Sequence, residues 1–225
     1  MKATTIIVAG GNGSRMNQDT PKQFLLLEGK PVLYHTILAF IHANPEMEII
    51  LVLPAEHLDH GKKLVEDLFP QKKINCVIGG QTRFHSVKAG LKTIINTELV
   101  LVHDAVRCLI TPDLIQRCMQ QAQEKTSAIP TIVSKDSIRM ITEDAGNVQL
   151  DRNRIRLVQT PQVFTYNLLW DAFQADYQER FTDEANVVEA SGAAVHLIEG
   201  EEENLKITFP SDLMLAAHIL KSRQA

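Results

Sequence analysis

Short apolar segments alternate with segments of helix length along most of the chain, and this alternation restricts the folds open to it. The strand candidates are rich in Ile and Val and cover residues 4–9, 48–53, 74–78, 98–103 and 127–133. The helix candidates lie near residues 31–42, 56–69, 82–95 and 112–124. Strands that alternate with helices form right-handed crossovers, which give a mostly parallel sheet covered on both faces. The chain is therefore predicted to be an α/β protein whose ligand lies beyond the carboxyl ends of the strands.

The C-terminal third continues with both kinds of element. The expected elements are helices near residues 165–175 and 183–191, strands near 194–198 and 204–208, and a last helix from Pro210. Gly192 is expected to cap the second of these helices at its C-terminus. Earlier in the chain, Pro31 and Pro112 stand where a first helical turn tolerates proline, and Thr111 is the expected N-cap before Pro112.

A glycine-rich segment follows the first strand directly. Gly10, Gly11 and Gly13 leave room for backbone N–H groups to crowd onto an anion, because they carry no side chain. Arg15 and Lys22 add the positive charge that a polyphosphate requires and a neutral ligand does not. This order of residues predicts a site for a nucleoside triphosphate.

Two common phosphate-binding motifs do not fit this segment. A P-loop needs a Gly-Lys-Ser/Thr sequence at its end, which is absent, and a dinucleotide fingerprint needs a third glycine where Met16 stands. An ordinary glycine turn is the alternative for the glycines alone. The two cations argue against it, as does Pro21, which fixes the backbone just before Lys22.

Composition excludes several classes of function. The 225 residues carry a net charge of −4, so the surface as a whole repels nucleic acid. No apolar run approaches the roughly 18 residues of a membrane span, and a strand is expected so soon after Met1 that no signal peptide fits. The three cysteines are an odd, sparse set, which favours a reducing compartment and a cytoplasmic location. His57 and His60 are interpreted as surface helix residues and not as metal ligands.

Residues 134–158 interrupt the alternation with a charged segment that has strand-like periodicity and a turn signal at residues 144–147. We expect a β-hairpin arm that projects from a single domain spanning residues 1–225. An isolated hairpin cannot bury a face by itself, so the arm is expected to pack on a second subunit in a homodimer. A solvated hairpin on a monomer is the alternative.

Two further clusters stand at strand ends. Gly80 and Arg83 lie between a strand and a helix, with Ser86 one turn into that helix, and are candidates to contact a base edge or a phosphate, although the cluster alone favours the simpler interpretation that follows. A tight turn with a helix cap is the alternative. Asp104 closes a buried strand and is a candidate ligand for Mg²⁺ or a ribose hydroxyl. The alternative is an ion pair with Arg107 that only closes the loop.

The last clusters are less specific. Taken alone, Arg152 in the arm is interpreted as an arginine exposed to solvent. Thr182 is most simply interpreted as the N-cap of the helix that follows it. Lys206 alternates with Leu205 and Ile207 on an expected strand, so it points away from the core, toward solvent or the cleft.

Taken in order, these segments resemble the polyol-phosphate cytidylyltransferase family. The resemblance extends from Val8 to Leu213 and rests on residues 9–16, 21–23, 79–80, 83, 86–87, 103–105, 151–152, 159–162, 182–184 and 204–206. It implies a Rossmann-like three-layer nucleotidyltransferase fold. It also implies transfer of CMP from CTP to 2-C-methyl-D-erythritol 4-phosphate, with release of pyrophosphate, in the non-mevalonate isoprenoid pathway.

The resemblance also implies roles for single residues. The catalytic set is Arg15, Lys22, Arg152 and Lys206, of which the first two would stabilise the transition state. The CTP-binding set is Ala9, Gly10, Gly11, Gly13, Gly80, Arg83, Ser86, Asp104 and Ala105, with Gly80 and Ser86 on the cytosine. The acceptor-binding set is Asp104, Ser137, Arg152, Thr160, Thr182 and Lys206, and Asp104 would also ligate Mg²⁺. In the family the arm reaches the neighbouring subunit's site.

The chain departs from the family pattern at two positions. Cys108 follows Arg107 where the family commonly has an Arg-Pro pair, and Ser137 stands where threonine is usual. Two alternatives to the implied function remain: the same chemistry on ribitol 5-phosphate, and a non-catalytic nucleotide sensor that has kept the fold. A dinucleotide-dependent oxidoreductase is disfavoured by Met16.

Overall fold

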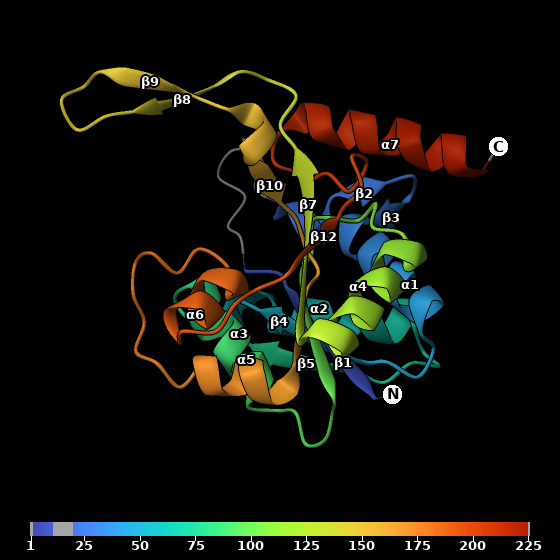
Figure 1. Cartoon of the computed structure of the whole chain (residues 1–225). Coiled ribbons are helices and arrows are strands. Elements are labelled where there is room, and N and C mark those ends of the chain that lie inside the picture. Colours follow the sequence, from blue (N-terminus) through green and yellow to red (C-terminus); the bar gives the residue numbers. More distant parts are fainter. Residues whose placement is uncertain (1, 11–19, 225) are drawn as a thin grey trace.

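The computed structural model describes residues 2–10 and 20–224 of the chain (Figure 1). The predicted roles of Gly11, Gly13 and Arg15 fall outside these residues and stay predictions.

A central sheet organises the described part of the chain. Four parallel strands form one half of it in the order β5 (Ile74–Ile78), β4 (Glu48–Leu53), β1 (Ala3–Val8) and β6 (Leu99–Asp104). The other half contains β11 (Gln162–Thr165), β7 (Ser127–Val133) and β10 (Arg156–Val158), which pair antiparallel, and β12 (Leu197–Glu199), which runs parallel to β7. The prediction of a mostly parallel α/β sheet is confirmed, because β1, β4, β5 and β6 make up its core.

Helices cover both faces of the sheet, as the alternation predicted (Figure 1). One face carries α1 (Val32–Ala43), α2 (Leu58–Leu68) and α4 (Pro112–Lys125); the other carries α3 (Arg83–Leu91), α5 (Tyr166–Ala172) and α6 (Glu184–Ala190). Successive strand residues alternate between the two cores, because side chains in a strand have a period of two. Ile7 and Leu51 belong to the first core, and Ile6 and Val52 to the second.

A third apolar cluster joins Leu27, Val32, Cys108 and Ile207 to the C-terminal helix α7 (Pro210–Gln224). The remaining short elements are η2 (Lys22–Phe24), β2 (Leu26–Leu27), β3 (Lys30–Pro31), η3 (Ala55–His57) and η4 (Arg152–Arg154). No helix in residues 2–10 and 20–224 is long and apolar enough to cross a membrane.

Local capping follows the sequence closely. The Thr111 hydroxyl accepts a hydrogen bond from the Leu114 backbone N–H at 3.1 Å, and Pro112 is the first residue of α4. Gly192 follows α6 with a positive φ of 88°, the left-handed conformation that favours glycine at a helix C-terminus. Both capping predictions are confirmed.

The arm is a hairpin, but a shorter one than predicted. β8 (Ile138–Ile141) pairs antiparallel with β9 (Asn147–Leu150), and this hairpin projects at the top of Figure 1. The expected excursion over residues 134–158 was too long at its C-terminal end, because β10 rejoins the main sheet beside β7. Residues 156–158 therefore obtain their backbone hydrogen bonds from the body of the protein.

In the C-terminal third, one expected strand is absent and one strand was missed. Residues 204–208 form no strand, because their polar groups bond to neighbouring loops: the Ile207 N–H donates to the Val106 carbonyl at 2.9 Å. β11 was not predicted, although it fills the position between β6 and β7. Its four residues lie between Pro161 and a helix and are too few to show periodicity. The organisation of residues 1–225 as one domain stays a prediction.

Candidate active site

A cavity of about 280 Å³ lies beyond the carboxyl ends of β1, β5 and β6. It is lined by Val8, Ala9, Gly10, Lys22, Gln23, Gly80, Gln81, Thr82, Arg83, Ser86, Asp104, Ala105, Val106 and Lys206. Ligands of open α/β sheets bind at this edge, because the loops that leave neighbouring strands converge there. The cavity therefore lies at the edge of the sheet where the sequence predicted the ligand.

Ser86 brings the loop after β5 against the start of the glycine segment. The Gly80 N–H donates to the Ser86 hydroxyl at 3.2 Å, and that hydroxyl donates to the Thr82 carbonyl at 3.0 Å. A Cβ at Gly80 would lie 2.3 Å from the Cβ of His85, so this close turn requires glycine. A Cβ at Gly10 would lie 3.9 Å from the Ser86 Oγ, so Gly10 and Ser86 border the same space.

Lys22 and Gln23 are fixed in the cavity wall by backbone acceptors. The ammonium group of Lys22 donates to the Ile207 carbonyl at 3.2 Å, and the residue is buried. The Gln23 amide donates to the Ala9 carbonyl at 2.9 Å, which ties η2 to the end of β1. The cavity wall thus holds a positively charged side chain beside the carboxyl end of β1. Its position is therefore suited to a phosphate.

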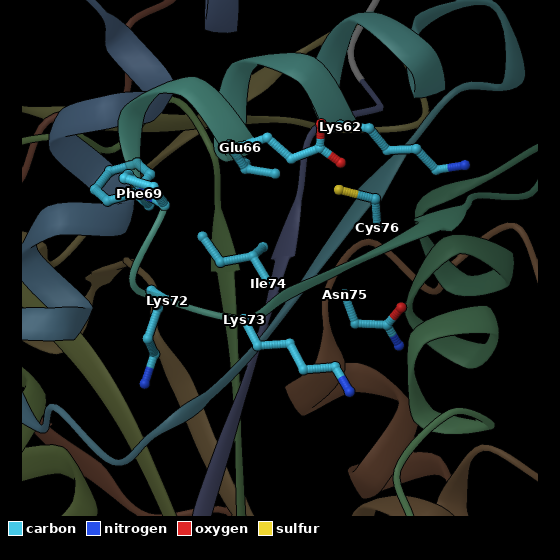
Figure 2. Close-up of a pocket in the computed structure, with 10 residues that line it drawn as sticks. Lys62, Glu66, Phe69, Lys72, Lys73, Ile74, Asn75 and Cys76 are labelled. Carbon is cyan, nitrogen blue, oxygen red and sulfur yellow. The ribbon is translucent and has the colours of Figure 1, made fainter.

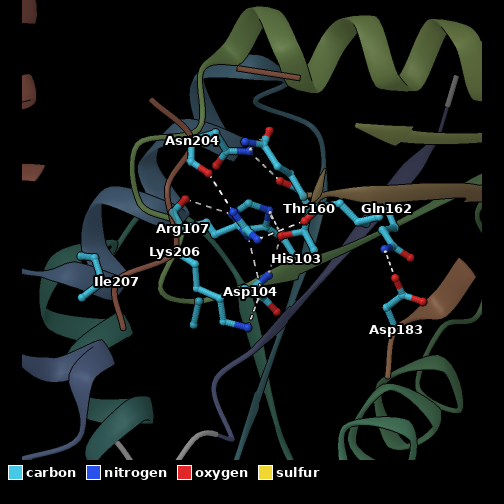
Figure 3. A network of polar contacts seen from close by, with 12 residues as sticks. His103, Asp104, Arg107, Thr160, Gln162, Asp183, Asn204, Lys206 and Ile207 are labelled. Carbon is cyan, nitrogen blue, oxygen red and sulfur yellow. Dashed lines mark hydrogen bonds and ion pairs between the residues drawn. The ribbon is translucent and has the colours of Figure 1, made fainter. Parts of the chain in front are cut away.

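Asp104 is the centre of a cluster of charged side chains (Figure 3). Its Oδ1 accepts from Arg83 Nη1 at 2.6 Å, and its Oδ2 lies 3.0 Å from Lys206 Nζ and 3.5 Å from Arg107 Nε. Burial opposes ionisation, but Arg83, Lys206 and Arg107 outweigh it and hold the pKa of the Asp104 carboxyl well below its usual range. Asp104 is therefore anionic at neutral pH, and the pair with Arg107 is only one of three.

Arg83 also contacts a second carboxylate, Glu184, to which the sequence analysis gave no role. Its Nη2 donates to Glu184 Oε2 at 2.9 Å. Burial raises the pKa of Glu184, and the Arg83 guanidinium opposes that shift. The only available signal was the position of Glu184 in the segment 182–184, and periodicity gives no hint that a charged first residue of a helix is buried.

A hydrogen-bonded chain behind Asp104 has a fixed direction. His103 Nε2 lies 3.1 Å from the Arg107 carbonyl, which can only accept, so this nitrogen carries the proton. The other ring nitrogen, Nδ1, then accepts from the Thr160 hydroxyl at 3.0 Å, and that hydroxyl accepts from the Asp104 N–H at 3.1 Å. Burial lowers the pKa of His103 to about 3, so its ring is neutral. His103 is a structural residue and not a base facing the cavity.

The loop that carries Lys206 is anchored on both sides of that residue. Arg107 Nη1 donates to the Asn204 carbonyl at 2.8 Å, and the Asn204 amide donates to the Thr160 carbonyl at 2.9 Å. On the other side, Ile207 accepts from Lys22. The Lys206 side chain, 46% exposed, points into the cavity toward Asp104 and not away to solvent.

Comparison with known proteins identifies the family. The family model of 2-C-methyl-D-erythritol 4-phosphate cytidylyltransferase matches residues 3–222. A protein of that name from Bacteroides thetaiotaomicron is 46% identical over 98% of this chain and 100% of its own length. One from Clostridium perfringens is 36% identical over 98% of this chain and 99% of its own.

The chain belongs to the 2-C-methyl-D-erythritol 4-phosphate cytidylyltransferase family.

Solved structures of the family agree with the fold. The 4-diphosphocytidyl-2C-methyl-D-erythritol synthase from Anaerococcus prevotii superposes with a TM-score of 0.84 at 28% identity, and the comparison covers 98% of each chain. The 2-C-methyl-D-erythritol 4-phosphate cytidylyltransferase from Thermus thermophilus gives 0.75 at 29% identity, over 98% of this chain and 100% of that one. The predicted function, a nucleotidyltransferase of the non-mevalonate pathway, is confirmed.

Most of the described residues that the family resemblance singled out converge on the cavity. Those lining it are Ala9, Gly10, Lys22, Gly80, Arg83, Ser86, Asp104, Ala105 and Lys206. Ser137, Arg152, Thr160 and Thr182 do not line it, and their roles stay predictions. Thr160 lies behind Asp104, and the arm residue Arg152 donates to the Lys135 carbonyl at 2.8 Å. The predicted N-cap role of Thr182 was wrong, because the Asp183 side chain accepts from Asn186 N–H at 2.9 Å and caps α6.

The described residues of the cavity offer Mg²⁺ one carboxylate ligand, Asp104. Asp104 is the single carboxylate among its described lining residues, and the described chain contains no group of three or more His, Cys, Asp or Glu side chains that could hold a metal. Mg²⁺ is commonly bound by one or two carboxylates, with substrate phosphates and water completing its shell. Asp104 therefore suits a magnesium ion that arrives with a triphosphate.

A second, larger cavity lies away from these residues. It measures about 500 Å³ and lies between α2 and β5, with Lys62, Glu66, Ile74 and Cys76 on its walls (Figure 2). No residue that the sequence singled out for substrate binding lines it. Burial raises the pKa of Cys76 here, and the pKa values of Cys108 and Cys118 to about 12, so these thiols stay protonated at neutral pH. The predicted cytoplasmic location stays a prediction.

Proposed function

We propose that the cavity beyond β1, β5 and β6 binds CTP with Mg²⁺ and directs the phosphate of 2-C-methyl-D-erythritol 4-phosphate onto its α-phosphorus. The observation that carries this proposal is the charge of the cavity wall. Three cationic side chains, Lys22, Arg83 and Lys206, face the space together with one carboxylate, Asp104. Both substrates are anions, and a site with excess positive charge offsets their mutual repulsion.

The reaction follows from these charges. An oxygen of the acceptor's phosphate monoester forms a bond to the α-phosphorus, and the bond from that phosphorus to the bridging oxygen breaks. Pyrophosphate leaves with the electron pair. The attacking oxygen is already ionised near neutral pH, so the site needs no general base. This agrees with His103, whose neutral ring is held by Thr160 and Arg107 and does not line the cavity.

We assign the described residues to separate parts of this reaction. The Gly80 turn and Ser86 bind the base, because backbone groups that approach this closely can read its edge. Lys22 stabilises the charge that develops on the transferring and leaving phosphates, together with Arg15 in the glycine segment. Lys206 positions the acceptor phosphate beside Asp104, which would ligate Mg²⁺. When bound there, the ion would neutralise phosphate charge.

We further propose that the arm completes the site of a second subunit. Its hairpin exposes Met140, Ile141 and Val148, with exposed fractions of 49%, 72% and 42%. An isolated two-stranded hairpin is marginally stable, and these side chains gain by packing on another chain. Arg152 stands at the base of this arm and outside the cavity lining of its own chain. In a homodimer it would reach the acceptor phosphate in the partner's cavity.

A pyrophosphate-release assay tests the reaction. The purified protein is incubated with Mg²⁺ and CTP, UTP, ATP or GTP, in the presence of 2-C-methyl-D-erythritol 4-phosphate or ribitol 5-phosphate. We expect rapid release only with CTP and the methylerythritol phosphate. Preference for ribitol 5-phosphate would transfer the proposal to that acceptor. Absence of release with every pair would indicate a nucleotide sensor.

A mixed dimer tests the role of the arm. Chains carrying Lys22→Ala and chains carrying Arg152→Ala are co-expressed with different affinity tags, and the dimer that carries both tags is purified. If the arm serves the partner, one of the two sites has both residues intact, and about half of the wild-type activity returns. If each arm serves its own chain, the mixed dimer is no more active than its parents.

A further inference from the structure

Glu184 is a charged side chain buried beside the site with no direct part in the proposed chemistry. It is 1% exposed and does not line the cavity. Its surroundings include the rings of Phe84, Phe173 and Phe181. A carboxylate in such surroundings is costly unless it is paired, and Arg83 is the partner that the structure gives it, at 2.9 Å.

The position of Glu184 is fixed by the sheet. Gln162 on β11 is fully buried, and its side chain makes two hydrogen bonds to the start of α6. Its Nε2 donates to Asp183 Oδ2 at 2.9 Å, and its Oε1 accepts from the Ala185 N–H at 2.8 Å. Figure 3 shows the first of these bonds. Glu184, between those two residues, is therefore presented to Arg83 from a rigid support.

Because Glu184 is present, the two terminal nitrogens of Arg83 donate to two different carboxylates. One terminal nitrogen, Nη2, is used on Glu184, and the other, Nη1, on Asp104 Oδ1. A guanidinium without a second partner prefers to bind both oxygens of one carboxylate. Here that arrangement is prevented, and Asp104 Oδ2 is left to Lys206 at 3.0 Å.

We propose that Glu184 is a positioning residue that keeps Arg83 on one oxygen of Asp104, so that the other oxygen orients Lys206 toward the acceptor phosphate. This inference rests on the proposed function, because it assigns Glu184 a part in that reaction through Arg83 and Asp104. It also gives a reason for the buried charge. The three cations Arg83, Arg107 and Lys206 face two carboxylates, and loss of one carboxylate would leave a larger excess of positive charge around Asp104.

Glu184→Gln is the direct test, because glutamine keeps the shape and one acceptor oxygen but removes the charge. Glu189→Gln, on the exposed side of the same helix, is the matched control. Changing a residue that supports a metal ligand typically costs about 10- to 100-fold in metal affinity or activity, and Glu184 would support the proposed ligand Asp104 through Arg83. We expect Glu184→Gln to lower kcat/KM by that factor, mainly through a raised KM for the acceptor, and Glu189→Gln to match wild type.

A double variant that also carries Lys206→Met distinguishes a positioning role of Glu184 from a general effect on stability. Lys206 is half exposed, so Lys206→Met should fold. If Glu184 acts through Arg83 and Asp104 on Lys206, adding Glu184→Gln to Lys206→Met lowers kcat/KM by less than about threefold, because the two sites are coupled. If each substitution lowers kcat/KM by its own full factor in the double variant, so that the two factors multiply, the proposal is wrong. It is also wrong if Glu184→Gln alone retains wild-type kcat/KM.

A crystal structure of the Glu184→Gln variant supplies a test without catalysis. We expect Arg83 to contact both oxygens of Asp104 and the distance from Lys206 Nζ to Asp104 to lengthen. Unchanged positions of all three side chains would overturn the inference. Failure of the proposed function would appear differently, because the wild-type protein would then release no pyrophosphate from CTP with either acceptor.

Discussion

Asp104→Asn should destabilise the protein strongly, although the substitution replaces a single heavy atom, an oxygen by a nitrogen. The wild-type carboxylate is 10% exposed as a side chain and lies within 3.5 Å of three cationic groups. An asparagine can keep its oxygen toward Arg83, but its NH₂ group then faces Lys206 and Arg107, which are also donors. Breaking a buried ion pair on one side costs about 3–5 kcal/mol.

The lower end of that range is expected here. Lys206 is 46% exposed and can turn into water, which relieves part of the repulsion, whereas Arg107 is held by the Asn204 carbonyl. A loss of about 3 kcal/mol corresponds to a fall in Tm of about 6–12 °C for a protein of this size. Urea unfolding followed by circular dichroism at pH 7 measures the free energy, and differential scanning calorimetry measures the Tm.

The pH dependence of this loss identifies its cause. The pKa of Asp104 is depressed in the folded state, so its ionisation stabilises the fold above the unfolded pKa of about 3.9. The difference between wild type and Asp104→Asn should stay constant from pH 5 to pH 8. It should shrink as the pH falls below about 4 toward the folded pKa, because Asp104 of the unfolded wild-type chain takes up a proton while the folded carboxylate does not.

The exposed ion pair of Asp113 and Arg117 supplies the control. Asp113 lies 2.8 Å from Arg117 but is 74% exposed, so Asp113→Asn should cost less than about 1 kcal/mol. If Asp104→Asn costs no more than this control at pH 7, the three cations do not depend on Asp104 and the description of the charged cluster is wrong.

Three further predictions concern other residues of the site. Lys22→Ala should lower kcat by roughly 10²–10³, as for loss of one preorganised electrostatic donor, and an unchanged kcat in steady-state assays would remove Lys22 from the mechanism. Arg152→Ala should raise the KM for the acceptor and leave the KM for CTP nearly unchanged, whereas equal effects would argue against an acceptor clamp. The ¹⁵N shifts of the His103 ring should stay constant from pH 5 to pH 8, because burial lowers its pKa to about 3; a titration near pH 6.5 would contradict this. Below about pH 6.5, His103 takes up a proton in the unfolded chain but stays neutral in the folded protein. This residue should therefore make stability fall as the pH drops below about 6.5.

The sequence predicted the parallel half of the sheet well. β1, β4 and β6 are mostly apolar because both of their faces are covered, and such runs can be recognised without knowledge of their neighbours. The same argument predicted the edge of the sheet at which the cavity lies, since it depends only on strand direction. The cap at Thr111 was also predictable, because the hydrogen bond joins residues three apart in the sequence.

The failures share a different physical origin. β11 has only four residues, and its place between β6 and β7 is set by pairing with strands distant in sequence. Residues 204–208 have the apolar alternation of a strand, but long-range bonds to Arg107, Val106 and Lys22 decide their conformation. Local pattern carries no information about such partners.

Only part of the charge pairing in the site could be predicted from the sequence. The sequence identified Asp104 from its place at a strand end, but it could not show that Arg83 reaches both Asp104 and Glu184, 21 and 101 residues away. The burial of Glu184 contradicts the usual exposure of glutamate, so composition and periodicity both mislead there. Only the fold brings α3 and α6 together.

A crystal structure of the protein with CTP and Mg²⁺ tests the central claim most directly. The account predicts the cytosine against the Gly80 turn and Ser86, and the triphosphate against Gly10 and Lys22, with the magnesium ion between the phosphates and Asp104. A nucleotide bound elsewhere, for example between α2 and β5, with Lys22 still turned to the Ile207 carbonyl, would contradict it.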